Sequence, residues 1–184
     1  MKRRLRYLII IFLIVVSTYS ANRVEAISIN EFPSTRPNTY VYDRANIINR
    51  ASRKQIEKKL IQLGENKIDP KLITVRGSDY EFSIDTFSTQ VLDKWSDNEN
   101  LGDLPLLLLI IDADFMDSYV IADERLTNQL PISLLKSTGL STMSEPLRRN
   151  NNYTEATING INRLNIVING GEDPGPPEAL YLNP

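Results

Sequence analysis

The sequence predicts an α/β fold, a compact sandwich in which a mixed central sheet is flanked by helices. Its centre is Leu104 to Ile111, an unbroken apolar run typical of a strand buried on both faces. A short buried helix is the alternative, but Pro105 and the acidic turn after the run favour the strand. Only six residues, Asp112 to Asp117, separate it from the next strand, so these two strands should be antiparallel neighbours. Segments with helical periodicity lie on either side of this pair.

Residues 1–26 have the pattern of an export signal and are set apart from the fold. A basic start is followed by an apolar stretch, Tyr7 to Val16, and then by a polar segment that ends in Val24, Glu25 and Ala26. The apolar stretch has about half of the roughly 20 residues needed to span a bilayer. This favours a cleaved signal over an uncleaved anchor.

The composition excludes several kinds of site. The 184 residues include no cysteine and no histidine, which excludes disulfides, thiolate zinc sites, cysteine nucleophiles and histidine-based catalysis. Catalysis would have to use carboxylates, Lys, Arg, Tyr, Ser or Thr, with a hard cation as the available metal. After residue 26 the chain has 16 Lys and Arg against 22 Asp and Glu, a net charge of −6. This balance argues against nucleic acid or an anionic membrane surface as partner.

The first part of the exported chain is predicted to lead into the sheet and then form a helix. Residues 27–42 contain two prolines among polar residues and should form an extended lead-in, ending in an edge strand at Tyr40 to Tyr42. A helix is expected from Arg50 to Glu65, with Asn49 as its N-cap. Apolar residues recur on one face of this helix at positions i, i+4 and i+7, namely Ile56, Leu60 and Leu63.

A second strand and a second helix are expected before the central strand. Leu72 to Arg76 is β-branched and closed by Gly77, as is typical of a strand. Ser83 then begins a helix that should run to about Asp97, with an apolar face. Trp95 lies on this face, and core packing is favoured over ligand stacking for it.

After the acidic turn the sequence predicts one more strand, Ser118 to Ala122, followed by helices. The expected helices are Pro131 to Ser137, Ser144 to Arg149 and Thr154 to Val167. Gly170 and Gly171 should end the last of them. The chain therefore divides into a signal peptide (1–26), a lead-in (27–42), an α/β domain (43–169) and a Pro/Gly-rich tail (170–184).

Candidate ligand-binding residues follow the central strand. Asp112 and Asp114 stand at its carboxyl end, where open α/β sheets usually bind ligands. Their alternate spacing resembles calcium loops, although the glycine and the distal glutamate of an EF-hand are missing. A solvated acidic turn is the alternative. Asp43 joins them only if its segment pairs beside the central strand. The candidate metal ligands are therefore Asp43, Asp112 and Asp114, with calcium as the cation, and no catalytic residue is assigned.

Several stretches, taken in their order along the chain, resemble the TPM domain family, which is named for thylakoid-lumen, photosystem II and acetylcholine-receptor-modulating members. They are Val41 to Ile48, the strand Leu72 to Arg76, the helix end at Trp95, the Leu-rich central strand, and the pattern from Tyr153 to Leu164. The sequence Gly-Gly-Glu-Asp-Pro-Gly-Pro-Pro at residues 170–177 looks like the cyanobacterial and plastid branch of the family.

The resemblance implies an α/β sandwich located in the thylakoid lumen or on the lumenal face of the thylakoid membrane. It implies support of photosystem II repair or photoprotection, through contacts with photosystem II subunits or assembly factors. Membrane attachment would be peripheral or through an uncleaved N-terminus. Acid phosphatase activity of plant relatives and calcium binding by some members imply an alternative, a metal-assisted acid phosphatase using Asp112, Asp114 and Asp43. A third alternative is a generic exported TPM domain without a photosynthetic role.

Overall fold

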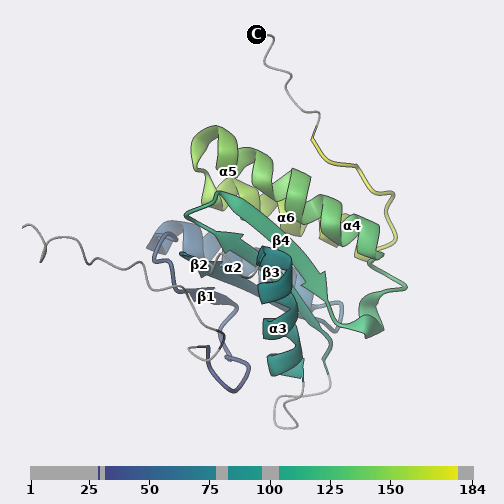
Figure 1. The fold of residues 1–184 in the computed structure, drawn as a ribbon. Coiled ribbons are helices and arrows are strands. Elements are labelled where there is room, and N and C mark those ends of the chain that lie inside the picture. The colour runs from purple at the N-terminus through teal and green to yellow at the C-terminus, as the bar shows by residue number, and fades with distance from the viewer. Residues whose placement is uncertain (1–28, 30–31, 78–82, 97–103, 178–184) are drawn as a thin grey trace, which may run out of the picture.

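Four strands form one mixed sheet with helices on both faces (Figure 1). The computed structural model describes residue 29 and residues 32–77, 83–96 and 104–177. The strands, in their order across the sheet, are β1 (Val41–Asp43), β2 (Asp69–Val75), β3 (Leu106–Asp112) and β4 (Asp117–Ala122). The first three are parallel, and β4 is antiparallel to β3. The predicted mixed sheet and the predicted antiparallel pair are confirmed.

The predicted export signal and the last seven residues of the tail lie outside the described residues. Within the part of the chain that is described, no helix has the length and apolar character needed to cross a membrane.

The central strand β3 is buried along its whole length, as the sequence predicts. It begins two residues later than expected, after Pro105, and Leu104 is 43% exposed. Successive side chains of β3 point to opposite faces of the sheet, and both faces are covered. Leu107, Leu109 and Ile111 pack in one hydrophobic cluster, and Leu106, Leu108 and Ile110 pack in the other.

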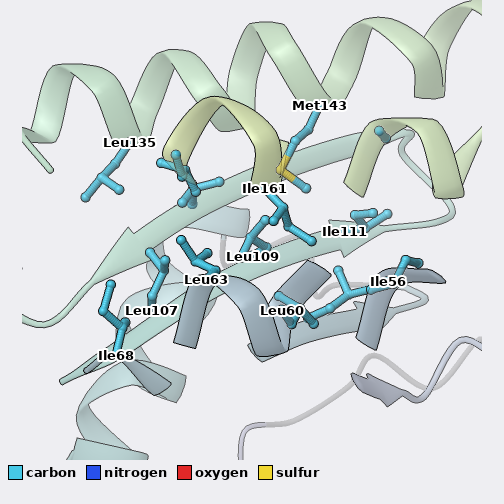
Figure 2. Packing of buried hydrophobic residues seen from close by; sticks show 14 of the residues in the cluster. Ile56, Leu60, Leu63, Ile68, Leu107, Leu109, Ile111, Leu135, Met143 and Ile161 are labelled. Atoms are coloured by element: carbon cyan, nitrogen blue, oxygen red, sulfur yellow. The ribbon is translucent and has the colours of Figure 1, made fainter. Parts of the chain in front are cut away.

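The larger cluster lies between the sheet and the helices α2 (Arg50–Gly64), α4 (Ile132–Ser137), α5 (Ser144–Asn150) and α6 (Tyr153–Ile168). Figure 2 shows Ile56, Leu60 and Leu63 of α2 facing the β3 side chains, with Ile161 of α6 close by. Each such side chain, fully buried, contributes about 1.5–3 kcal/mol. The predicted N-cap of α2 is confirmed, because the Asn49 side chain accepts hydrogen bonds from the backbone N–H of the second and third residues of the helix.

The strand β2 begins at Asp69, three residues before its predicted start, and includes Pro70. The Leu72 N–H donates to the Tyr40 carbonyl on the β1 side. Two residues earlier, the Pro70 nitrogen points to the same side, where β1 has not yet begun. No ladder hydrogen bond is lost there, which is why β2 tolerates the proline. The edge strand β1 lies one residue later than predicted.

The lead-in is part of the core on the other face of the sheet, together with α3 (Ile84–Ser96). The Phe32 ring centroid lies 5.2 Å from that of Phe87 and 6.1 Å from that of Trp95. Trp95 is fully buried, which confirms its predicted packing role. Arg36 is 5% exposed and donates hydrogen bonds to the Trp95 carbonyl, at 3.3 Å, and to Asp69, at 3.2 Å. The lead-in thus covers the apolar side of α3.

Between α4 and α5 the chain stays helical, whereas the sequence predicts two separate short helices. A π-helix, Thr138–Met143, joins them. Gly139 in this segment lies against the backbone of β4. A Cβ atom built on it would be 2.9 Å from both the Tyr119 Cα and the Val120 nitrogen. The absence of a side chain therefore permits the close approach of helix and strand.

The start of the tail is fixed to α6. Gly170, with φ +83°, ends the helix as predicted. Arg163, which is buried, donates hydrogen bonds to both carboxylate oxygens of Asp173, at 2.7 and 2.8 Å, and to the Thr142 hydroxyl, at 2.9 Å. The hydrogen bonds from the Arg163 side chain lower the pKa of Asp173 below its ordinary value. Asp173, one of the two acidic residues of the Pro/Gly-rich motif, therefore anchors the tail.

The tail contact should weaken in acid. Because the folded-state pKa of Asp173 is lowered, its stabilising effect is complete above the unfolded-state pKa of about 3.9 and is lost as the pH falls through the lower folded-state pKa. We expect Asp173→Asn to lower the thermal midpoint by a constant amount from pH 7 to pH 5. The difference from the unmodified chain should then shrink toward pH 2.5 in thermal unfolding followed by circular dichroism. A difference that stays constant to pH 2.5 would contradict the contact.

Candidate functional site

The carboxyl ends of the parallel strands meet at one edge of the sheet, where the sequence places its candidate ligands. Asp43 ends β1 and Asp112 ends β3, with Thr74 and Val75 of β2 between them. Asp114 lies in the turn between β3 and β4. The edge is therefore acidic, as predicted, but each carboxylate has its own local partners.

Asp43 is held by donors from three segments. Its side chain, 2% exposed, accepts hydrogen bonds from the backbone N–H of Ile47 and Ile48, at 3.1 and 3.0 Å, and from the Thr74 hydroxyl, at 2.5 Å. Arg53 of α2 lies 3.7 Å from the same carboxylate. Asp43 thus shapes the loop that leads from β1 into α2 and fastens this loop to β2.

Asp112 shapes the turn that follows β3. It is 1% exposed, and its Oδ1 accepts hydrogen bonds from the backbone N–H of Asp114, at 2.9 Å, and of Phe115, at 3.4 Å. Such side-chain bonds to the next residues are typical of Asx-turns. The carboxylate is consequently directed at its own backbone.

Asp114 is the most exposed of the three carboxylates. Its side chain is 34% exposed and its Oδ1 lies 3.5 Å from the Arg76 guanidinium. Arg76 also donates a hydrogen bond to the Ala45 carbonyl, at 3.0 Å, which connects the turn to the loop after β1. The pair gives this edge a cation beside an accessible anion.

The structure brings Asp112 and Asp114 together and keeps Asp43 apart from them. β2 lies between β1 and β3, so the pairing that would bring Asp43 to the central strand does not occur. Asp43 also points to the α2 face, as Val41 does, whereas Asp112 alternates with Ile111 and points to the opposite face. Among the described residues, no group of three or more acidic side chains is arranged to hold a metal ion. The metal site and its calcium stay predictions.

A buried polar network at the start of β4 has no counterpart in the sequence prediction. The Ser118 and Ser144 hydroxyls lie 2.9 Å apart, and both reach the Gly139 carbonyl, at 2.9 and 3.1 Å. The Asp117 carboxylate lies 3.3 Å from Ser144 Oγ and accepts a hydrogen bond from Arg148, at 3.1 Å. Since both hydroxyls are buried on the π-helix carbonyl, they join this helix to β4. The long sequence separation of the two serines left no signal of this contact.

A groove of about 530 Å³ runs along β4 between α3 and α4. We call it the β4 groove. It is lined by residues 119–123 of β4 and its continuation, by Leu92, Asp93 and Ser96 of α3, and by Leu130, Ile132, Leu135 and Lys136 in and before α4, with Glu124, Arg125 and Thr127 at one end. No sequence pattern predicted this groove, because it depends on how the two helices pack at the edge of the sheet.

The TPM domain family model matches residues 41–167, which include the whole sheet and the helices described above, except for the last residue of α6. The chain belongs to the TPM domain family. This confirms the family that the sequence resembles, while the photosystem II branch of TPM domains stays a prediction. The three carboxylates and the lining of the β4 groove lie within the matched TPM domain.

The TPM domain is also similar in fold to the N-terminal domain of a protein from P. gingivalis, solved in solution by NMR. The TM-score is 0.57 at 18% sequence identity, and the match covers 72% of this chain and 83% of that one. At this identity the similarity shows the fold alone. No curated protein matches the chain.

Proposed function

We propose that this TPM domain protein supports photosystem II repair or photoprotection from the lumenal side of the thylakoid membrane, acting through protein contacts. Photosystem II subunits or assembly factors are its proposed partners, and membrane attachment is peripheral or through an uncleaved N-terminus. The location and the process come from the resemblance of the sequence motifs to the cyanobacterial and plastid branch, including the anchored motif around Asp173.

One observation favours contacts over catalysis. The predicted carboxylates have structural partners, and Asp43 and Asp112 point to opposite faces of the sheet. Catalysis of hydrolysis by carboxylates needs two or more groups that converge on one reacting atom or one metal ion. An arrangement in which Asp43 and Asp112 diverge supports a domain whose surface, rather than its acidic edge, carries the function.

A metal-assisted acid phosphatase is the second candidate, and one contact favours it. The Arg76 guanidinium lies beside Asp114 at the carboxyl edge, and a phosphoryl group in transfer requires such a cation. In this candidate Asp112 and Asp114 hold the metal, with calcium as the proposed ion.

Deletion of the gene should slow the recovery of photosystem II after strong light, because a contact partner of repair would be missing. The measurement is variable chlorophyll fluorescence during recovery in low light, with the deletion strain complemented by the intact gene as control. Fractionation of thylakoids tests the location in the same strains. Unchanged recovery, or a protein absent from thylakoids, would instead support the generic exported TPM domain.

A further inference from the structure

β4 is the outer strand of the sheet, and half of its backbone groups point away from β3. The Asp123 N–H donates to the Leu106 carbonyl, at 2.8 Å, which fixes which residues face the neighbouring strand. In an antiparallel pair, residues whose backbone groups bond to the neighbouring strand alternate with residues whose backbone groups point away from it. Tyr119 and Ile121 therefore also bond to β3, while Val120 and Ala122 direct their N–H and C=O groups outward. These outward groups border the β4 groove.

Some of the outward backbone groups of β4 already have a hydrogen-bond partner or a close neighbour, and others have neither. The Ser118 N–H is bonded to the Asp117 carboxylate, at 3.1 Å, and the Val120 nitrogen lies close to Gly139 of the π-helix. Within the described part of the chain, no hydrogen bond engages the N–H of Ala122 or the carbonyls of Val120 and Ala122. The open part of the edge is thus the end of β4 that lies in the groove.

The walls of the groove offer apolar surface on the α4 side. Ile132 at the start of α4 is 60% exposed, and Leu130 and Leu135 continue this surface into the core. On the other side, Leu92 of α3 contributes a nearly buried side chain. Because α3 and α4 belong to opposite faces of the sheet, the edge of β4 lies between them (Figure 1). A groove with an apolar wall along an open strand edge suits an extended peptide segment, because such a segment can add to the sheet.

The lining of the groove has one exposed carboxylate on α3, that of Asp93, and one at the end of the groove, that of Glu124. Asp93 and Glu124 are exposed and have no ion-pair partner among the described residues. The Asp123 carboxylate, by contrast, is bonded to the Arg125 guanidinium, at 2.8 Å, and this hydrogen bond lowers the pKa of Asp123. Among the described residues, two carboxylates therefore remain available to a basic ligand. Of the two cations in the lining, Arg125 is bonded to Asp123 and Lys136 lies on the α4 side.

We infer that the β4 groove binds an extended peptide segment of a partner protein, which adds to the sheet beside β4. Its backbone pairs with Ala122 and with the Val120 carbonyl, its apolar side chains pack on Ile132, and its basic side chains face Asp93 and Glu124. In strand addition the backbone hydrogen bonds give affinity and the flanking side chains give specificity. The inference rests on the proposed role in protein contacts and names the chemistry of the partner segment.

The test uses a fluorescent eight-residue peptide of alternating Val and Lys, titrated with the purified full chain and followed by anisotropy. We expect saturable binding that weakens about 30-fold when every backbone amide of the peptide is N-methylated, since the two hydrogen bonds to the Val120 and Ala122 carbonyls are lost and each costs about 1 kcal/mol. Ala122→Pro should weaken binding about fivefold, because it removes the single outward N–H without touching the bonds to β3.

A second variant, in which two acidic residues of the groove are replaced by lysine, tests the inference even if the proline variant does not fold. Asp93→Lys/Glu124→Lys, which changes two exposed side chains, should lose affinity for the Val/Lys peptide and gain affinity for a Val/Glu peptide. Lys58→Ala on α2, far from the groove in sequence and structure, is the matched control and should leave both affinities unchanged.

Two results would overturn strand addition. One is equal binding of the N-methylated peptide, which would indicate attraction by charge alone, and the other is absence of saturable binding. The outcome is separate from that of the gene deletion. Slow photosystem II recovery without peptide binding would refute only strand addition in the β4 groove. Peptide binding with normal recovery would refute only the photosynthetic role.

Discussion

Gly139→Ala should lower the free energy of unfolding by about 2–3 kcal/mol, the upper range for overpacking a well-packed core. The added methyl group would lie 2.9 Å from the Tyr119 Cα and the Val120 nitrogen, and both are backbone atoms of β4. Neither atom can move away without shifting the strand that pairs with β3. The π-helix would have to withdraw, which also loosens the Ser118 and Ser144 hydrogen bonds to the Gly139 carbonyl.

Gly160→Ala is the matched control for this prediction. Its added Cβ would meet Met143 at Cγ and Sδ, at 2.7 and 2.8 Å, which are atoms of a flexible side chain. The alanine also gains about 1 kcal/mol of helix propensity in α6. We expect a net change within about 1 kcal/mol in urea unfolding of the two variants. Equal losses for both glycines would show that the contact with the β4 backbone is not special.

The elements of this fold follow from local sequence patterns. The apolar run of β3 predicted its burial on both faces, the spacing of Ile56, Leu60 and Leu63 predicted the buried face of α2, and Asn49 predicted its start. These predictions are confirmed because they depend on the periodicity of apolar residues in a helix or strand and on hydrogen bonds between residues close in sequence.

The site depends on features that the sequence does not carry locally. Two features decide whether Asp43 lies near Asp112: the order of the strands in the sheet, and the face of the sheet to which each side chain points. Both are set by the pairing of strands that are far apart in sequence. The same holds for Arg36, a charged residue in a Pro-containing segment that becomes buried through contacts with Trp95 and Asp69. The π-helix depends on Gly139 meeting a strand about 20 residues earlier in the chain.

Asp43→Ala should be as destabilising as the change at Gly139, with a loss of about 3 kcal/mol in the free energy of unfolding. The carboxylate is 2% exposed and accepts the N–H groups of Ile47 and Ile48 and the Thr74 hydroxyl. Alanine would leave these donors without an acceptor, and an unsatisfied buried donor costs about 1–3 kcal/mol. Urea unfolding of the variant measures the loss.

Asp114→Ala is the matched carboxylate at the same edge. It is 34% exposed and forms an ion pair with Arg76 at 3.5 Å, so its loss should change the free energy of unfolding by no more than about 1 kcal/mol. A large effect at Asp43 with a small one at Asp114 identifies Asp43 as a structural residue. Similar small effects at both positions would contradict the structural role of Asp43.

Calcium then separates the two candidate functions. For a domain that acts through contacts, we expect the thermal midpoint to be the same with and without calcium, and purified protein to leave a phosphomonoester intact. A metal-assisted phosphatase requires the opposite: stabilisation by calcium and metal-dependent hydrolysis, both lost in Asp112→Asn/Asp114→Asn. Because Asp112 and Asp114 adjoin in one turn while Asp43 faces away, such a site would rest on two carboxylates and on ligands supplied by water or substrate.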